Sequence, residues 1–339
     1  MKKQLLILAL IKKEKKMPST NVLGFFTNSD GSITIQLGNF LYFLTLIALI
    51  LIIYFSIKLC HKRGKHFANK YILAILIFNF CLHFVKQLFP TYSKDWPNSL
   101  WKSSFENLCA ALIILAPFIY ISKNKYLKDY MFYIGVISGL GVYLFPAAVF
   151  GIDLRNLDSF VDVTRFYICH IPLALCGILM VEEGFHKLDY KRLWVLPFSY
   201  IGFQMIIFLN DLILFVCQAG AFYDYYGPIS EKQSWLDFFY RDGIANESAN
   251  FGFRESFDSM FSWLYIPYLM TFKLEGRIYF IPVLYQFIPV CILAWPIGLI
   301  MSYPWQKEQY KIDYLNHKIK KAKIETKVNY KSKLLNKLD

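Results

Sequence analysis

The sequence predicts an all-α polytopic membrane protein: a bundle of about seven transmembrane helices, with the N-terminus outside and the C-terminus cytoplasmic. Apolar residues make up 56% of its 339 residues, and the mean hydropathy is +0.37. A soluble domain is nearer ~45–50% apolar. The apolar residues also form long runs instead of stripes with the period of a strand or of an amphipathic helix, and such runs favour membrane spans over a soluble core.

Seven apolar runs approach or exceed the ~20 residues that a helix needs to cross ~30 Å of hydrocarbon. We expect spans at 39–59, 71–89, 105–122, 129–150, 165–182, 193–217 and 279–303. They form a transmembrane domain of residues 39–303, between a basic and polar segment, 1–38, and a lysine-rich cytoplasmic tail, 304–339. A long outer loop, 218–278, separates the last two spans, and its aromatic-rich stretch 258–273 is expected to be interfacial or re-entrant.

The distribution of Lys and Arg in the short loops predicts the orientation, because cytoplasmic loops are enriched in both. One set of loops holds four, three and three (60–70, 123–128, 183–192), and the opposite set holds two and one (90–104, 151–164). The tail adds ten lysines, which places it in the cytoplasm. The six lysines of residues 1–16 disagree with an outer N-terminus, so we expect Met17 to be the true start.

The net charge of +13 does not indicate a nucleic-acid partner. Eleven of these charges lie in residues 1–16 and 304–339, outside the spans, and no recognition motif accompanies them. Lysines next to a last helix are typical of contact with anionic lipid. The expected partners are therefore membrane lipids, with anionic headgroups at the tail.

Four of the spans carry polar residues near the same predicted membrane face. Counted at ~1.5 Å per residue, these residues lie roughly 6–10 Å below the outer ends of their spans. They are His83, Cys109, His170 and the pair Asn210–Asp211. Polar side chains in hydrocarbon are costly and usually face a bundle interior or an aqueous cavity. We therefore expect a polar outer cavity, lined also by Glu106 and Asn107.

Cys109 and His170 suggest nucleophilic chemistry. A thiol in apolar surroundings stays protonated unless a base is near, and a histidine can take that proton and later return it to a leaving group. Simpler explanations stay open, since Cys109 can be a packing residue, His170 a structural hydrogen-bonding group and Asn210 a link between helices. Gly135 and Gly139 form a GxxxG pattern, which predicts close helix packing.

Three stretches carry a resemblance to a known family: FENLCAALIILAP at 105–117, GVISGLGVYLFP at 135–146 and FYICHIPLALCGILM at 166–180. Over roughly residues 39–215 the chain resembles the YwaF-like family of bacterial integral membrane proteins. That family is similar to eukaryotic transmembrane protein 164, regarded as a phospholipid acyltransferase with a membrane-embedded Cys and His. The chain departs from the family pattern in having Asn107 where a histidine usually precedes the cysteine, and Asp211 where a tyrosine often follows the asparagine.

The resemblance implies a multi-pass lipid acyltransferase or lipid hydrolase of the plasma membrane, acting on phospholipid acyl esters without a metal or organic cofactor. Cys109 would be the nucleophile and His170 the base and then the acid, with Asn107, His83 and Asn210 polarising the carbonyl. The alternative is a small-solute or lipid transporter, or its substrate-binding subunit, in which Asp211 and His83 relay protons. A weaker alternative is a scaffold whose lysine tail recruits partners.

Overall fold

The computed structural model describes residues 31–93, 100–219, 227–240, 271–274, 277–280 and 282–335. Each expected span overlaps a helix, although several bounds differ. The helices are α2 (Phe40–Arg63), α3 (Lys65–Val85), α4 (Pro90–Ser93), α6 (Leu108–Ile121), α7 (Lys125–Leu144), α8 (Leu157–Glu182), α9 (Val195–Val216), α11 (Lys232–Tyr240) and α15 (Pro282–Leu335), with 3-10 turns η2 (Lys86–Leu88), η3 (Ala147–Val149) and η4 (Tyr190–Arg192). A small antiparallel hairpin, β1 (Thr271–Leu274) with β2 (Arg277–Phe280), precedes α15.

In the part of the chain that the structure describes, four helices are long and apolar enough to cross a membrane. They are α2, α3 with its η2 extension, α8 and α9, and α6 is a shorter apolar helix. The protein is thus a predominantly helical membrane protein, while seven spans and the orientation stay predictions. The hairpin was not expected: it covers the end of the 218–278 loop and the first two residues of the expected span 279–303. Most of the predicted interfacial stretch, 258–270, lies outside the described residues.

Asparagine side chains set where several helices begin. Asn39, Asn107, Asn124 and Asn156 each accept a hydrogen bond from a backbone N–H in the first turn of α2, α6, α7 and α8. Such a cap satisfies a donor that has no partner inside the helix. Because Asn107 is the cap, α6 begins at Leu108, three residues later than the expected start at 105.

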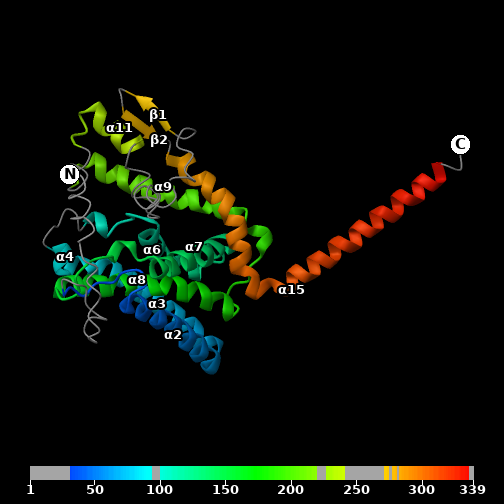
Figure 1. The fold of residues 1–339 in the computed structure, drawn as a ribbon, viewed down its shortest axis with the longest axis horizontal. Coiled ribbons are helices and arrows are strands. Elements are labelled where there is room, and N and C mark those ends of the chain that lie inside the picture. The colour runs from blue at the N-terminus through cyan, green and yellow to red at the C-terminus, as the bar shows by residue number, and fades with distance from the viewer. Residues whose placement is uncertain are drawn as a thin grey trace, which may run out of the picture.

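The glycines of α7 bring it unusually close to α8, as the GxxxG pattern predicts. A Cβ built on Gly139 would lie 2.6 Å from the backbone nitrogen of Ala174 and 2.9 Å from the carbonyl oxygen of His170. Only a residue without a side chain allows this approach. Helices α3, α6, α7, α8 and α9 surround the resulting apolar core (Figure 1).

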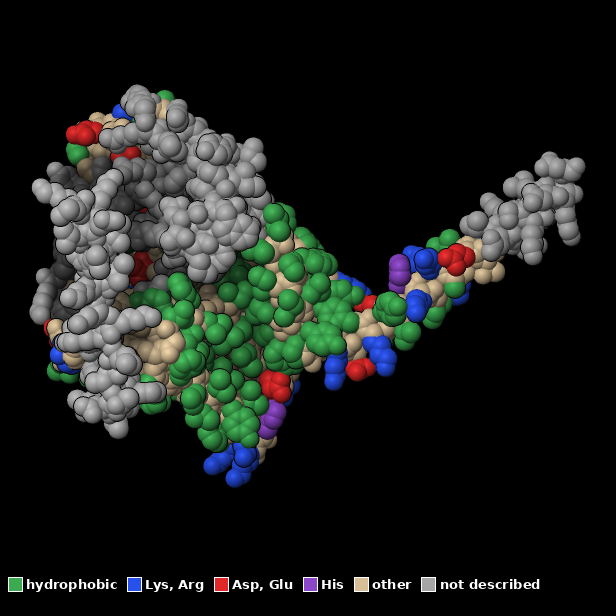
Figure 2. Space-filling model, in the orientation of Figure 1, with side chains coloured by type: hydrophobic (Ala, Val, Ile, Leu, Met, Phe, Trp, Pro, Cys, Tyr) green, Lys and Arg blue, Asp and Glu red, His purple; other side chains and the backbone are tan. Residues whose placement is uncertain are grey.

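The outside of the bundle is apolar as well. Helix α2 exposes Phe43, Ile47, Ile50 and Phe55, and Figure 2 shows hydrophobic side chains over a broad face of the body. An exposed apolar surface of this extent is a liability in water but is what a lipid-facing surface requires.

Helix α15 continues far beyond the expected end of the last span at residue 303. It comprises 54 residues and includes most of the lysine-rich segment, which projects from the body in Figure 1. The segment after Pro304 contains no Gly or Pro and many good helix formers, which explains why it is helical. The expected tail is therefore a helix as far as Leu335.

Candidate active site

Cys109 lies in the first turn of α6, directly after the Asn107 cap. The Asn107 side chain accepts a hydrogen bond from the backbone N–H of Ala110 at 2.9 Å, and the cysteine is 8% exposed. The first turn of a helix combines unpaired backbone N–H groups with the positive end of the helix dipole. A thiolate is favoured at such a position. A cysteine deeper in a helix would have no unpaired backbone N–H groups beside it.

His170 is buried on α8, and its ring orientation follows from one hydrogen bond. Nδ1 lies 2.6 Å from the carbonyl oxygen of Phe166. A carbonyl can only accept, so Nδ1 carries the proton and the neutral ring keeps its lone pair on Nε2. The Phe166 ring packs against the imidazole with centroids 4.5 Å apart. Nε2 is thereby the nitrogen that can take a proton.

The turns that carry Cys109 and His170 converge on Gly135 of α7. A Cβ at Gly135 would lie 3.4 Å from Cδ2 of Leu112 and 2.9 Å from the carbonyl oxygen of Leu173. Leu112 and Leu173 each follow the cysteine or the histidine by three residues, which places them one turn along the same helix face. The two candidate catalytic residues therefore lie near one level of the bundle, on the two helices that pack against the same face of α7.

His83 holds the segment that leads into α6. Its Nε2 lies 3.1 Å from the carbonyl oxygen of Ser103, so the ring donates to the backbone there, and the residue is buried. The expected polariser of a substrate carbonyl is thus engaged with residues 103–107, hereafter the α6 entry segment.

Glu106 of the α6 entry segment is the centre of a buried charge cluster. Lys86 Nζ lies 3.4 Å from one carboxylate oxygen, and Lys102 Nζ lies 2.9 Å from the other. The side chain of Lys86 is only 5% exposed. A buried ammonium requires such a partner. Glu106 was expected in the cavity, but neither lysine was predicted as its partner. The i,i+4 spacing of Lys102 and Glu106 was a sequence signal for that pair, whereas no spacing predicts contact between Lys86 and the entry segment.

Asn210 and Asp211 attach α9 to the same segment. The Asn210 amide donates to Ser104 Oγ at 3.0 Å and to the Asp211 carboxylate at 3.2 Å. Asp211 is 1% exposed. The α6 entry segment is therefore held by α3 on one side and α9 on the other, which fixes the start of α6 and the position of Cys109.

A second polar cluster lies on α8 before His170. Arg165 donates to Asp162 at 2.7 Å and to the hydroxyl of Tyr92 at 2.6 Å, and Asn79 donates to the carbonyl of Cys169 at 2.9 Å. Burial raises the pKa of the Tyr92 phenol, which stays a neutral donor. The i,i+3 spacing of Asp162 and Arg165 was a sequence signal for this ion pair, although Tyr92 was not predictable.

Tyr130 of α7 is a further residue that the sequence analysis missed. It is fully buried and stacks on Phe203 with centroids 4.1 Å apart. Tyr130, Tyr200 and Cys109 belong to one buried core cluster. The Tyr130 hydroxyl has no hydrogen-bond partner among the described residues. A buried unpaired hydroxyl costs ~1–3 kcal/mol, so an oxygen that reached this donor would be stabilised by it.

The described residues contain no group of three or more His, Cys, Asp or Glu side chains arranged to hold a metal ion. The polar groups around Cys109 are hydrogen-bonding and ion-pairing residues. They can bind a polar ligand, orient it and move a proton.

Apolar spanning helices around a buried polar cluster define an integral membrane protein. The chain belongs to the TMEM164 family, whose model matches residues 32–239, more than half of its length. The resemblance expected from the sequence is thus confirmed, and the match contains both Cys109 and His170. No curated protein and no solved structure gives a match.

Proposed function

We propose that this protein is a lipid acyltransferase or lipid hydrolase of the plasma membrane, acting on phospholipid acyl esters through Cys109 and His170. The observation that supports this function best is the hydrogen bond from His170 Nδ1 to the Phe166 carbonyl, 2.6 Å long. It leaves Nε2 as the base, at the level of a cysteine in the first turn of α6.

In the first half-reaction, Cys109 Sγ attacks the ester carbonyl carbon while His170 Nε2 takes the thiol proton. The tetrahedral intermediate collapses by breaking the carbon–oxygen bond, and the leaving alkoxide takes the proton from His170. The products are a lysolipid and an acyl thioester on Cys109. In the second half-reaction, His170 takes a proton from the acceptor hydroxyl, which attacks the thioester, and the departing thiolate recovers that proton. A lysolipid acceptor gives transfer, and water gives hydrolysis.

The carbonyl oxygen needs donors as negative charge develops on it. We assign this role to the backbone N–H groups of the first turn of α6, with the unpaired Tyr130 hydroxyl as a further donor in the same buried cluster. His83 and Asn210, expected as polarisers, hold the α6 entry segment, so we assign them to positioning. Asn107, also expected as a polariser, is the cap of α6, so we assign it to positioning as well.

An acyl-enzyme assay tests this proposal. Membranes with the wild-type chain are incubated with a phospholipid that carries a clickable acyl chain, and hydroxylamine-sensitive label on the protein is measured. We expect label on the wild type, none on Cys109→Ala and slow labelling of His170→Ala. Cys176→Ala is the matched control, because Cys176 is also a buried helix cysteine. Undiminished label on folded Cys109→Ala, or no label on any form, would refute the proposal.

A transporter is the second candidate, and the buried Asp211 favours it. A carboxylate that is 1% exposed within a spanning helix is a feature of proton relays. In proteoliposomes, proton-coupled solute uptake that is lost in Asp211→Asn but kept in Cys109→Ala would establish this function. Absence of uptake together with acyl-enzyme formation would exclude it.

A further inference from the structure

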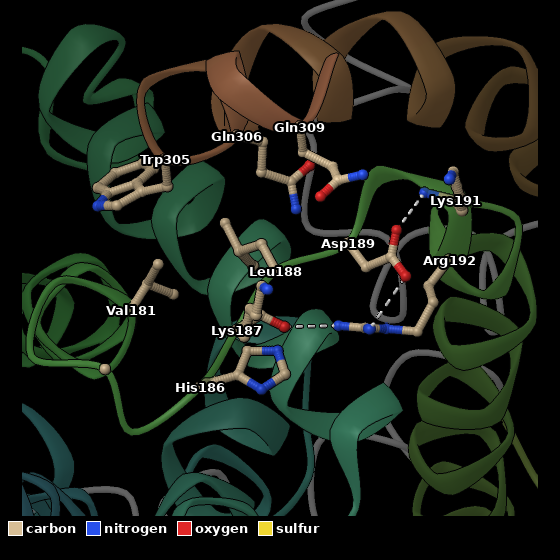
Figure 3. A pocket seen from close by; sticks show the side chains of 11 residues that line it. Val181, His186, Lys187, Leu188, Asp189, Lys191, Arg192, Trp305, Gln306 and Gln309 are labelled. Atoms are coloured by element: carbon tan, nitrogen blue, oxygen red, sulfur yellow. Dashed lines mark hydrogen bonds and ion pairs between the residues drawn. The ribbon is translucent and has the colours of Figure 1, made fainter. Parts of the chain in front are cut away.

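A cavity of about 620 Å³ lies at the other end of the bundle, between the connection from α8 to α9 and the helix α15 (Figure 3). Val181, Leu188 and Trp305 provide apolar lining, and Lys187, Arg192 and Gln306 provide polar lining. Ligand pockets typically enclose ~300–1,000 Å³ and combine an apolar wall with a few placed polar groups. The cavity has the size and the composition of a binding site.

One wall of the cavity is fixed by a buried ion-pair cluster centred on Asp129 of α7. Arg192 Nε and Nη2 lie 2.6 and 3.0 Å from the two carboxylate oxygens, and His186 Nε2 lies 2.7 Å from one of them. Arg192 Nη2 also donates to the carbonyl of Lys187 at 2.8 Å. The bidentate pair gives the guanidinium a fixed orientation, so this wall is preformed.

Hydrogen-bond donors predominate around the cavity. The Gln306 Oε1 atom accepts from the backbone N–H of Tyr190 at 3.0 Å, so the amide NH₂ group is free to face the cavity, as Figure 3 shows. Lys187 is exposed. Arg192 Nη1 donates one N–H to Asp189 at 3.5 Å, which leaves its second N–H as a further donor. Of the three lining cations, Arg192 is paired with Asp129 and Lys191 with Asp313, so within the described residues Lys187 is the lining cation without an ion pair. An anionic ligand with several acceptor oxygens matches this arrangement.

The apolar wall indicates that the anion is attached to a lipid. Trp305 is anchored by a hydrogen bond from its indole nitrogen to Glu182 at 2.7 Å. Tryptophan is enriched at the headgroup level of membranes, and basic pockets between membrane helices bind lipid headgroups. The cavity also lies at the end of the bundle where Lys and Arg are most frequent in the loops. A soluble phosphoester would not need this apolar wall.

We propose that this cavity binds the phosphate group of an anionic phospholipid, held by Gln306, Lys187 and Arg192 with its glycerol portion against Trp305. The site is at the opposite end of the bundle from Cys109, and it does not depend on acyl transfer. It is also distinct from the lysines of the projecting part of α15.

Photocrosslinking tests the proposal. The full chain is placed in nanodiscs of phosphatidylcholine with a small fraction of phosphatidylglycerol that carries a photoactivatable group near its glycerol, and labelled peptides are mapped by mass spectrometry. We expect label on residues 181–192 and 305–309. Label confined to other segments would overturn the proposal.

Gln306→Glu is the decisive variant. It keeps an oxygen for the Tyr190 N–H but replaces the NH₂ donor by a negatively charged oxygen, so labelling should fall about tenfold. Lys307→Gln is the matched control, since it changes the net charge equally on the next residue without lining the cavity. It should keep labelling within about twofold. An equal fall in both variants would show diffuse surface attraction and overturn the proposal.

Two further arms complete the test. Lys187→Gln should also reduce labelling, and since Lys187 is exposed, this variant stays informative if Gln306→Glu does not fold. Soluble glycerol 3-phosphate at millimolar concentration should leave the lipid label unchanged. Displacement of the label by this competitor would identify a soluble phosphoester as the ligand and refute the lipid assignment.

Discussion

Replacing Gly139 by alanine should separate α7 from α8. The added Cβ would lie 2.6 Å from the backbone nitrogen of Ala174, 2.7 Å from its Cβ and 2.9 Å from the carbonyl oxygen of His170. Two of these three atoms belong to the backbone, so no side-chain rotation relieves the clash. Overpacking of this kind costs ~1–3 kcal/mol, and the rigid neighbours place Gly139→Ala at the upper end of that range.

Gly141→Ala in the same helix provides the control for propensity. Nothing lies within 4 Å of a Cβ at Gly141, and alanine is favoured over glycine in a helix by ~1 kcal/mol. Both variants gain that term, so the difference between them isolates the packing cost of about 3 kcal/mol. The free energy of unfolding of the purified chain, measured by chemical denaturation in detergent, gives the comparison.

The same clash should displace His170, since its carbonyl is one of the atoms in contact. We therefore expect Gly139→Ala to slow acyl-enzyme formation, with Gly141→Ala unchanged. If the two variants unfold at the same denaturant concentration, α7 and α8 do not approach each other closely at Gly139. The placement of His170 beside α7 would then be refuted as well.

Three further predictions concern polar contacts. Glu106→Gln leaves the buried Lys86 without its carboxylate and should cost ~3 kcal/mol of unfolding free energy. Lys86→Met should cost less, because Glu106 keeps Lys102 as a partner. Equal losses of the two variants in chemical denaturation would contradict the cluster. Hydrogen bonds from Arg155 lower the pKa of Asp153 to about 2. Its stabilising contacts should therefore persist near pH ~4 and be lost only as the pH falls to about 2. A titration of the Asp153 carboxyl carbon followed by NMR with a midpoint near ~3.9, the value of a free aspartate, would refute this. Asn107→Ala removes the cap of α6 and should cost about 1 kcal/mol, whereas Asn107→Asp should unfold like the wild type, and no difference between these two variants would count against the cap.

The positions of the helices were predictable because each depends on a local property. An apolar run long enough to span a membrane must be helical, since lipid offers no partner for the backbone. The start of α6 at Leu108 could also have been predicted, because Asn107 is a typical cap residue. The apolar pattern alone placed the start at residue 105. The helical continuation beyond 303 was missed because a change from apolar to charged residues ends a span without ending a helix.

The members of the candidate site were only partly predictable. Counting residues along each span predicts a shared depth for residues such as His170 and Asn210, and their membership of one site stays a prediction. Which side chains meet depends on how each helix is rotated and packed. Contacts between residues far apart in the sequence decide this, such as those of Gly135 in α7 with Leu112 in α6 and Leu173 in α8. For that reason the partnership of Lys86 with Glu106 and the role of Tyr130 could not be obtained from spacing.

The projecting part of α15 has a consequence for how its lysines act. Residues 304–335 form about 48 Å of helix at ~1.5 Å per residue, whereas the screening length in physiological salt is ~8 Å. A rod standing upright on a membrane would present only its nearest lysines to the surface potential, and a rod lying flat would present nearly all of them. The number of charges that such a rod presents to a membrane is therefore set by its tilt, and a bend near Pro304 would change that number without altering any lysine.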